Sequence, residues 1–319
     1  MKQRVAAIDC GTNSLRLLIA DVDPARHELT DVERRMEIVR LGQGVDATGM
    51  LAPEALERTF RVLAEYAGQV TATRAGAVRM VATSATRDAG NAAEFARGVR
   101  DVLGVSPEVI SGQEEARLSF SGATAELGGQ ESGAEVAPRP PYLVVDIGGG
   151  STEFVLGGSG TSAELAAISV NVGCVRLTER HLHSDPPSAA EITAACADID
   201  RGLDDVAAAV PVDEARTLVG LAGSVTTITA IALGLPVYDA RRTHHARLSA
   251  TDVRRVTGQL LGQSRAQRAA IGAMHPGRVD VIGAGALILD RLMDRFGFAE
   301  MVTSEHDILD GIAWSIAGA

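Results

Sequence analysis

Lysine is almost missing from this chain. Lys2 is the only lysine among the 30 basic residues of a 319-residue sequence. The phosphate loop of Walker-type nucleotidases ends in Gly-Lys followed by Ser or Thr, so that loop cannot be built here. Any phosphate chemistry must therefore use backbone N–H groups, arginines and a metal ion.

Cysteines, net positive charge and long apolar runs are also scarce. Cys10, Cys174 and Cys196 lie far apart and form no C-x-x-C pair, which argues against a disulfide framework or zinc site and favours a reducing compartment. The formal net charge of −11 disfavours a nucleic-acid binder that relies on a broad basic field. No run of 18 apolar residues is present, so we expect a cytoplasmic protein without a membrane partner.

The length of the chain predicts two domains, because it exceeds the size at which single cores stop growing. Alternating strand and helix signals in both halves predict an α/β protein with mixed sheets flanked by helices. A stretch rich in Gly, Ser and Pro interrupts this alternation. We expect an N-terminal domain over 1–128, a linker over 129–141 and a C-terminal domain over 142–303, with a final helix at about 304–319 as a candidate to pack back onto the first domain.

Hydrophobic spacing places the individual elements. In the first half the predicted strands cover 4–9, 15–21, 36–42 and 77–85, and the predicted helices cover 53–70, 91–103 and 112–127. In the second half the predicted helices cover 188–210, 224–234, 249–263 and 281–297.

One phrase occurs twice, as "IDCGTNS" at 8–14 and "VDIGGGS" at 145–151. Each copy reads as strand, glycine turn and strand, and the N–H groups of such a turn can form a concave anion site that glycine lets a phosphate approach closely. Two copies with matched Asp and Ser positions favour phosphate binding over turns needed only for folding. The candidate phosphate-binding residues are Gly11, Thr12, Asn13, Ser14, Gly148, Gly149, Gly150 and Ser151.

The two copies differ two residues after the serine. In register, Asp9 aligns with Asp146, but Arg16 aligns with Glu153. Arginine suits a phosphate, whereas a pair of carboxylates suits Mg²⁺ (or Mn²⁺), so Asp146 and Glu153 are candidate metal ligands with Asp9 as a third. An active-site cleft between the halves would offer arginine from one wall and carboxylates from the other.

Two adjacent carboxylates, Glu114 and Glu115, open the helix predicted over 112–127. Neighbouring residues on a helix point about 100° apart, so only one can face a cleft, and the residues alone do not choose between them. Arg87 follows a predicted strand and precedes a helix, which is typical of cleft residues. The segment 240–249 gathers three arginines and two histidines, and either guides a polyanion or forms an exposed loop.

The opening "DCGTNSLRLLIAD" resembles that of the exopolyphosphatase/guanosine pentaphosphate phosphatase (Ppx/GppA) family. Further matching segments follow in family order over essentially the whole chain: "ATSATRDAGN" (82–91), "VISGQEEARLSFSGA" (109–123), "VDIGGGSTEF" (145–154), "GCVRLTERHL" (173–182), "LAGSVTTITA" (221–230), "DVIGAGALIL" (280–289) and "VTSEHDILDGI" (302–312). The chain resembles the short, two-domain form of this family. The resemblance implies two ribonuclease H-like (actin/Hsp70-type) domains with an interdomain active-site cleft.

It also implies a function: Mg²⁺-dependent removal of terminal orthophosphate from inorganic polyphosphate. Guanosine pentaphosphate (pppGpp) is the alternative substrate, and an actin-like ATPase or kinase, or a non-catalytic sensor, is a further alternative. The family pattern makes Glu115 the catalytic base and Arg16 and Arg87 substrate-binding residues, and implies a homodimer. Gly223 and Ser224 resemble the superfamily loop that receives a nucleotide, while Ser224 is equally consistent with a helix cap.

Overall fold

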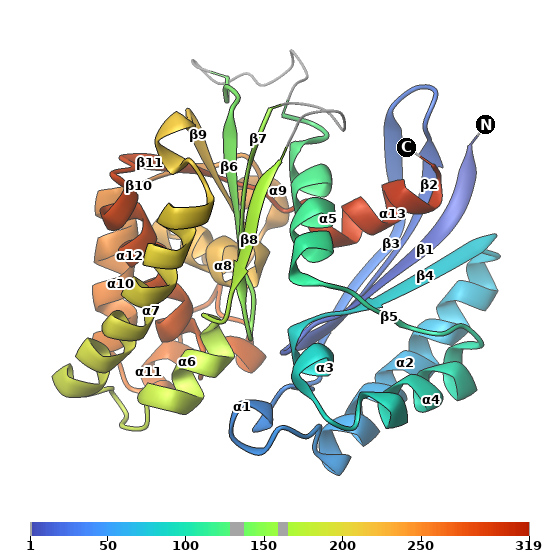
Figure 1. Cartoon of the computed structure of the whole chain (residues 1–319), viewed down its shortest axis with the longest axis horizontal. Helices are drawn as coiled ribbons and strands as arrows, with labels where there is room; N and C mark the ends of the chain where they lie inside the picture. The colour runs from blue at the N-terminus through green and yellow to red at the C-terminus, as the bar shows by residue number, and fades with distance from the viewer. Residues whose placement is uncertain (1, 128–136, 159–164, 319) are drawn as a thin grey trace. The chain divides into compact units, whose positions relative to one another are not determined.

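The structure is a computed structural model that describes residues 2–127, 137–158 and 165–318. Of the expected linker, residues 129–136 lie outside this range. Contacts within the chain define two compact units, Met1–Gly122 with Ile308–Ala319, and Ala123–Asp307. Each unit is an α/β structure built on one mixed sheet (Figure 1).

The sheet of the first unit has five strands in the order β3-β2-β1-β4-β5. Strand β1 is antiparallel to β2 and parallel to β4, β2 is antiparallel to β3, and β4 is parallel to β5. The strands cover Gln3–Cys10 (β1), Ser14–Asp23 (β2), Glu28–Ile38 (β3), Ala77–Ala82 (β4) and Glu108–Val109 (β5). Strands β1 and β2 form the first predicted hairpin.

Helices cover both faces of this sheet. Phe95 and Val99 of α4 and Leu63 of α2 join one apolar cluster with β1 and β2, while Ile312 of α13 and Leu118 of α5 join a separate cluster. The helices of the unit cover Val45–Thr48 (α1), Pro53–Thr73 (α2), Ser84–Asp88 (α3), Ala92–Leu103 (α4), Gly112–Thr124 (α5) and Ile308–Ile316 (α13).

The C-terminal helix α13 packs against β1, β2 and β4 of the first unit. Its buried Asp310 accepts two hydrogen bonds from the guanidinium of Arg34 in β3, at 2.5 and 3.1 Å. Gly311 allows a close backbone approach, since a methyl group there would lie 2.0 Å from the carbonyl oxygen of Leu118. The end of the chain thus completes the layer opposite α2 and α4.

The sheet of the second unit has six strands in the order β10-β11-β9-β6-β7-β8. They cover Tyr142–Ile147 (β6), Thr152–Gly157 (β7), Ala166–Val170 (β8), Thr217–Leu221 (β9), Arg247–Ser249 (β10) and Glu300–Thr303 (β11). Read from β8 to β11, the order and the directions of the strands repeat those of the first sheet. The predicted fold of two ribonuclease H-like domains with mixed sheets is thereby confirmed, with β10 as an added edge strand.

Helices α7, α10 and α12 contribute a large part of the apolar core of the second unit, where Leu203, Leu260 and Leu289 are buried with β6 and β7. The helices cover Cys174–His181 (α6), Ala189–Ala209 (α7), Ala222–Ala232 (α8), Ala240–Thr243 (α9), Ala250–Gly262 (α10), Arg265–Ala269 (α11) and Ile282–Phe296 (α12), with 3-10 turns at Val212–Glu214 and Pro276–Arg278. Helix α7 begins with a capping box between Ser188 and Glu191.

The predicted boundaries of two strands were wrong. The third strand was expected over 36–42, but β3 covers Glu28–Ile38. It is an edge strand with mostly polar residues, and charge on an edge strand hides the apolar alternation that marks a half-buried one. The strand expected over 77–85 ends at Ala82 because the chain turns there into α3.

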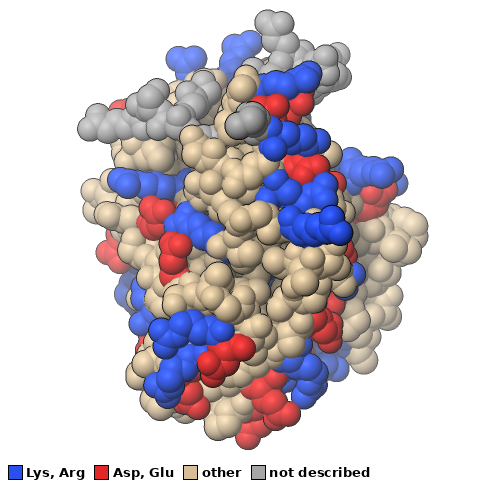
Figure 2. All heavy atoms as spheres, turned by 90° about the vertical axis from the view of Figure 1, so that its right-hand side faces the viewer, with Lys and Arg blue, Asp and Glu red and all other residues tan. Residues whose placement is uncertain are grey.

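No helix in the described part of the chain is long and apolar enough to cross a membrane. On the face drawn in Figure 2, positive and negative side chains lie next to one another. Exposed ion pairs of the first unit include Arg35 with Glu33 and Arg79 with Glu108.

Candidate functional site

The first hairpin joins the buried end of β1 to β2. The N–H of Gly11 donates to the carbonyl of Ser14 at 3.0 Å, which closes the turn. The carbonyl of Asn13 accepts from the N–H groups of Val39 and Arg40 at 3.0 and 2.9 Å. The hydroxyls of Thr12 and Ser84, the first residue of α3, are 2.9 Å apart. These contacts fix the turn on the body of the first unit.

The second hairpin joins β6 to β7 with the same turn. The N–H of Gly148 donates to the carbonyl of Ser151 at 3.0 Å, as in the first copy. The start of α6 packs on this turn, because Cys174 N–H donates to Gly148 and Val175 N–H to Gly149 at 3.0 and 2.8 Å. The turn carbonyls are therefore held by α6.

The tips of both turns present backbone N–H groups. Within the described ranges, no residue accepts a hydrogen bond from the N–H groups of Thr12 and Asn13, or from those of Gly149 and Gly150. Successive N–H groups in a turn form a concavity that binds anions. The corresponding positions of the two copies thus share the geometry of an oxyanion site.

Arg16 lies opposite Asp9 across strands β1 and β2. Its Nε and Nη2 donate to Asp9 Oδ2 at 2.8 and 2.6 Å, and the Asp9 side chain is only 3% exposed. Charge-assisted bonds of this kind fix the guanidinium plane. Arg16, predicted to bind phosphate, is therefore paired with Asp9, which was predicted as a third metal ligand.

The second hairpin has two carboxylates in the same arrangement. Asp146 lies opposite Glu153 across β6 and β7, and both residues are buried. Glu153 Oε1 accepts a hydrogen bond from the hydroxyl of Ser169 in β8 at 2.7 Å. Like charges directly opposite one another in a sheet repel, so a cation bound beside them stabilises the pair. Carboxylate oxygens are ligands that Mg²⁺ takes.

Arg87 and Glu115 are brought together in the first unit. The Nη1 of Arg87, in α3, donates to Ile110 O at 2.9 Å and to Glu115 Oε2 at 3.1 Å. Glu115 is 8% exposed. Glu114 instead points toward Arg79, 3.7 Å away, and its side chain is 40% exposed. The structure thus distinguishes the two adjacent carboxylates, which sequence reasoning alone did not.

Gly223 and Ser224 belong to α8 rather than to a loop, because the helix begins at Ala222 directly after β9. The helix has no side-chain cap, so the proposed capping role of Ser224 is wrong. A methyl group at Gly223 would lie 1.2 Å from Nη1 of Arg278, so this guanidinium lies against the helix start. Arg278 was missed; its only sequence signal was its place beside the matched segment 280–289.

The segment 240–249 does not form one exposed loop. It contains α9 and β10, and Thr243 and Leu248 are buried. Arg247 pairs with Glu300 on the adjacent strand β11, whereas the side chains of Arg241 and Arg242 are exposed.

Two α/β units share one strand order, and each has a glycine-turn hairpin as its first two strands. These features define a class of protein that handles phosphate. The model of the Ppx/GppA phosphatase family matches residues 18–318. The chain belongs to this family, and the prediction of a phosphohydrolase is confirmed.

Similar proteins cover the whole chain. Exopolyphosphatase 2 of Mycobacterium tuberculosis is 52% identical over 326 aligned positions, which include 99% of each chain. The crystal structure of an exopolyphosphatase-like protein is 44% identical and superposes with a TM-score of 0.93, covering 99% of this chain and 98% of the other. The Ppx/GppA family member from Aquifex aeolicus is 30% identical, with a TM-score of 0.81 and the same coverage.

Proposed function

We propose that this chain is an exopolyphosphatase that hydrolyses the terminal phosphoanhydride bond of inorganic polyphosphate and releases orthophosphate. The observation that carries the proposal is the matched pair of hairpins, in which equal turns lie between Asp9 and Arg16 in one unit and between Asp146 and Glu153 in the other. The 52% identity to a relative named exopolyphosphatase 2 supports the choice of substrate.

In this proposal the first unit holds phosphate and activates water. The N–H groups of the first turn and the guanidinium of Arg16 bind phosphoryl oxygens. Glu115 accepts the proton of the attacking water, and Arg87, which donates to its Oε2, orients that carboxylate. The new bond joins the water oxygen to phosphorus, while the bridging P–O bond breaks and its electrons remain on the shortened chain.

The second unit supplies the charge-neutralising groups. Asp146 and Glu153 would hold Mg²⁺ or Mn²⁺, since hard oxygen ligands from two buried carboxylates fit such a cation. The ion, when bound, would neutralise charge on the phosphoryl oxygens. The second turn, with Ser151, binds further oxygens. Asp9 acts first by positioning Arg16, with metal ligation as its secondary role.

The substrate is tested by side-by-side release of orthophosphate, with Mg²⁺, from short polyphosphate, long polyphosphate, pppGpp and ATP. We expect the largest kcat/KM for polyphosphate. A preference for pppGpp would transfer the proposal to alarmone hydrolysis, with Gly223, Ser224 and Arg278 as the first place to look for a guanosine contact. A preference for ATP would contradict both polyphosphate and pppGpp as the substrate.

The proposal includes a homodimer, as the family resemblance implies, and a location in the cytoplasm. Light scattering of the purified protein gives its mass directly, to be compared with the 33.2 kDa of one chain.

A further inference from the structure

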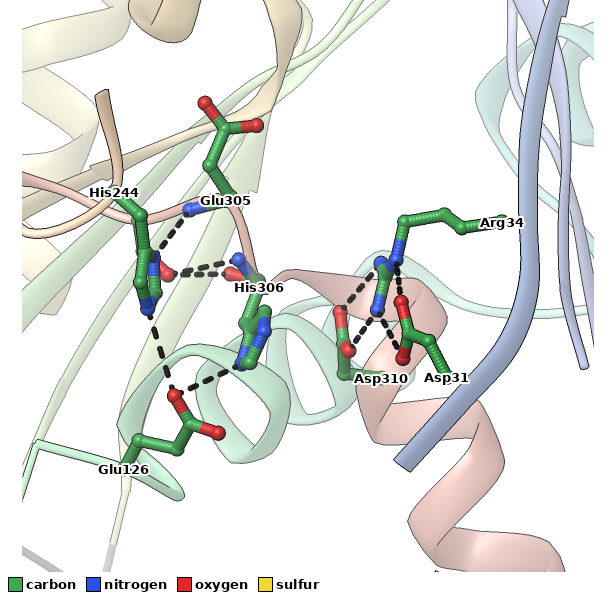
Figure 3. Close-up of polar contacts among 8 residues, drawn as sticks. Asp31, Arg34, Glu126, His244, Glu305, His306 and Asp310 are labelled. Atoms are coloured by element: carbon green, nitrogen blue, oxygen red, sulfur yellow. Dashed lines mark hydrogen bonds and ion pairs between the residues drawn. The ribbon is translucent and has the colours of Figure 1, made fainter. Parts of the chain in front are cut away.

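Three side chains from distant parts of the second unit converge (Figure 3). Glu126 follows α5, His244 follows α9, and His306 follows β11. One donor atom of each lies within 4.8 Å of the other two. The sequence did not suggest that these three residues act together, because nothing in their spacing along the chain resembles a metal-binding motif.

The distances suit a tetrahedral ion. Glu126 Oε2 lies 3.5 Å from Nε2 of His244 and 3.5 Å from Nδ1 of His306. Two ligands bound about 2.1 Å from a tetrahedral Zn²⁺ lie about 3.4 Å apart. The third pair of donors, at most 4.8 Å apart, would need to approach by no more than about 1.4 Å.

We propose that Glu126, His244 and His306 form a binding site for a transition-metal ion of the Zn²⁺ class, with water as the fourth ligand. Imidazole nitrogens select Zn²⁺ over Mg²⁺, which prefers oxygen. The site goes beyond the proposed hydrolysis and does not depend on it.

The surroundings hold the ligands in place. The ring of His245 stacks on that of His244 with centroids 3.7 Å apart. The backbone of His245 is left-handed, at φ 59°, an uncommon conformation outside glycine.

A backbone hydrogen bond provides a second way to detect metal binding. The N–H of Glu305 donates to Nδ1 of His244 at 3.1 Å, which places the proton of the neutral ring on Nε2. Coordination through Nε2 replaces that proton and moves the ring N–H to Nδ1, so this hydrogen bond must break. Metal binding is expected to shift the amide resonance of Glu305.

Glu126 and His306 also lie close to the two points where the chain passes between its units. These points are Gly122 to Ala123 and Asp307 to Ile308. A bound ion would cross-link the two connecting segments on the side of the second unit. We therefore expect Zn²⁺ to raise the unfolding temperature of that unit.

The test is calorimetric titration of the full-length protein with Zn²⁺ in millimolar Mg²⁺, which keeps the oxygen-rich site occupied by Mg²⁺. We expect one saturable Zn²⁺ per chain, and at least a tenfold loss of affinity in both Glu126→Gln and His306→Gln. His183→Gln, at an exposed histidine of the same unit, and Glu153→Gln, in the proposed Mg²⁺ site, are expected to leave the Zn²⁺ affinity unchanged.

Crystals soaked in Zn²⁺ give an independent answer through anomalous scattering. A peak bonded to the three side chains, together with the Glu305 amide shift, supports the site. Absence of saturable binding, a peak elsewhere only, or unchanged affinity in His306→Gln would overturn the proposal, whatever the outcome for polyphosphate hydrolysis.

Discussion

The two hairpins have the same backbone arrangement but carry side chains of opposite charge at one position. Both close with a Gly N–H to Ser carbonyl bond of 3.0 Å, and both place an Asp opposite the residue two positions after the serine. In the first unit that residue is Arg16, which neutralises Asp9 within the protein. In the second unit it is Glu153, so that two buried carboxylate side chains occupy the corresponding positions.

This comparison separates what the repeated fold supplies from what single substitutions supply. Both units have this turn and its outward N–H groups because they share the fold, and these N–H groups suit an anion in either unit. In the proposed function, one side chain then decides whether the neighbouring position holds a phosphate directly or holds a cation. This arrangement would let a protein with a single lysine handle a polyanion.

The largest effect on activity is expected from replacing Glu115, which belongs to the first unit. Replacing it with Gln should lower kcat for orthophosphate release by about 10²–10⁴-fold with little change in KM, because a general base contributes about that much. Glu114→Gln is the matched control, since that neighbour points toward Arg79 and is expected to retain activity. Equal losses of kcat in the two variants would contradict the role of general base that we assign to Glu115.

Arg16→Gln should lower kcat/KM about 10–100-fold, since a hydrogen bond to a charged group contributes about 1.5–3 kcal/mol. Most of this loss is expected in KM. Arg35→Gln, on the exposed strand β3 and paired with Glu33, should leave both parameters unchanged. A loss of activity as large in the control would show that overall charge, rather than the hairpin, is responsible.

The two aspartates should differ in their effect on the Mg²⁺ requirement. Asp146→Asn removes a proposed metal ligand, so half-maximal activity should need at least tenfold more Mg²⁺. Asp9→Asn removes a hydrogen-bond partner of Arg16, so the free energy of unfolding should fall by about 1–3 kcal/mol, with a smaller change in the Mg²⁺ requirement. Urea denaturation and Mg²⁺ titration of activity measure the two effects; an equal rise of the Mg²⁺ requirement in both variants would contradict the difference between the two aspartates.

The hairpins could be predicted from sequence because their signal is local. Apolar strands, a glycine turn and period-two alternation fixed the alignment of Asp9 with Asp146 and of Arg16 with Glu153, and the cross-strand partners follow it. The start of β3 could not be predicted, since an exposed edge strand needs no apolar alternation.

Contacts between distant segments were the other limit. The family resemblance chose Glu115 over Glu114, but the residues alone did not, because the difference depends on where α3 carries Arg87. The convergence of Glu126, His244 and His306 depends on three separate turns. Helical spacing gives the direction of a side chain relative to its own helix, but not what another element places opposite it.

The smallest effect distinguishes the two turns themselves. A methyl group at Gly148 would lie 2.9 Å from the carbonyl oxygen of Ser151, whereas at Gly11 it would lie 3.5 Å from that of Ser14. Gly148→Ala should therefore lower the free energy of unfolding by about 1–3 kcal/mol, as overpacking does. Gly11→Ala should be neutral or raise it by up to about 1 kcal/mol, because alanine restricts the unfolded chain.

Both alanine variants should be compared by urea denaturation without metal or phosphate, so that only the turns differ. A larger loss for Gly148→Ala would mean that the second turn is the tighter of the two, held between its own closing bond and the start of α6. Equal losses would mean that both turns need glycine for the same reason, so that the contrast between the hairpins would lie entirely in Arg16 and Glu153.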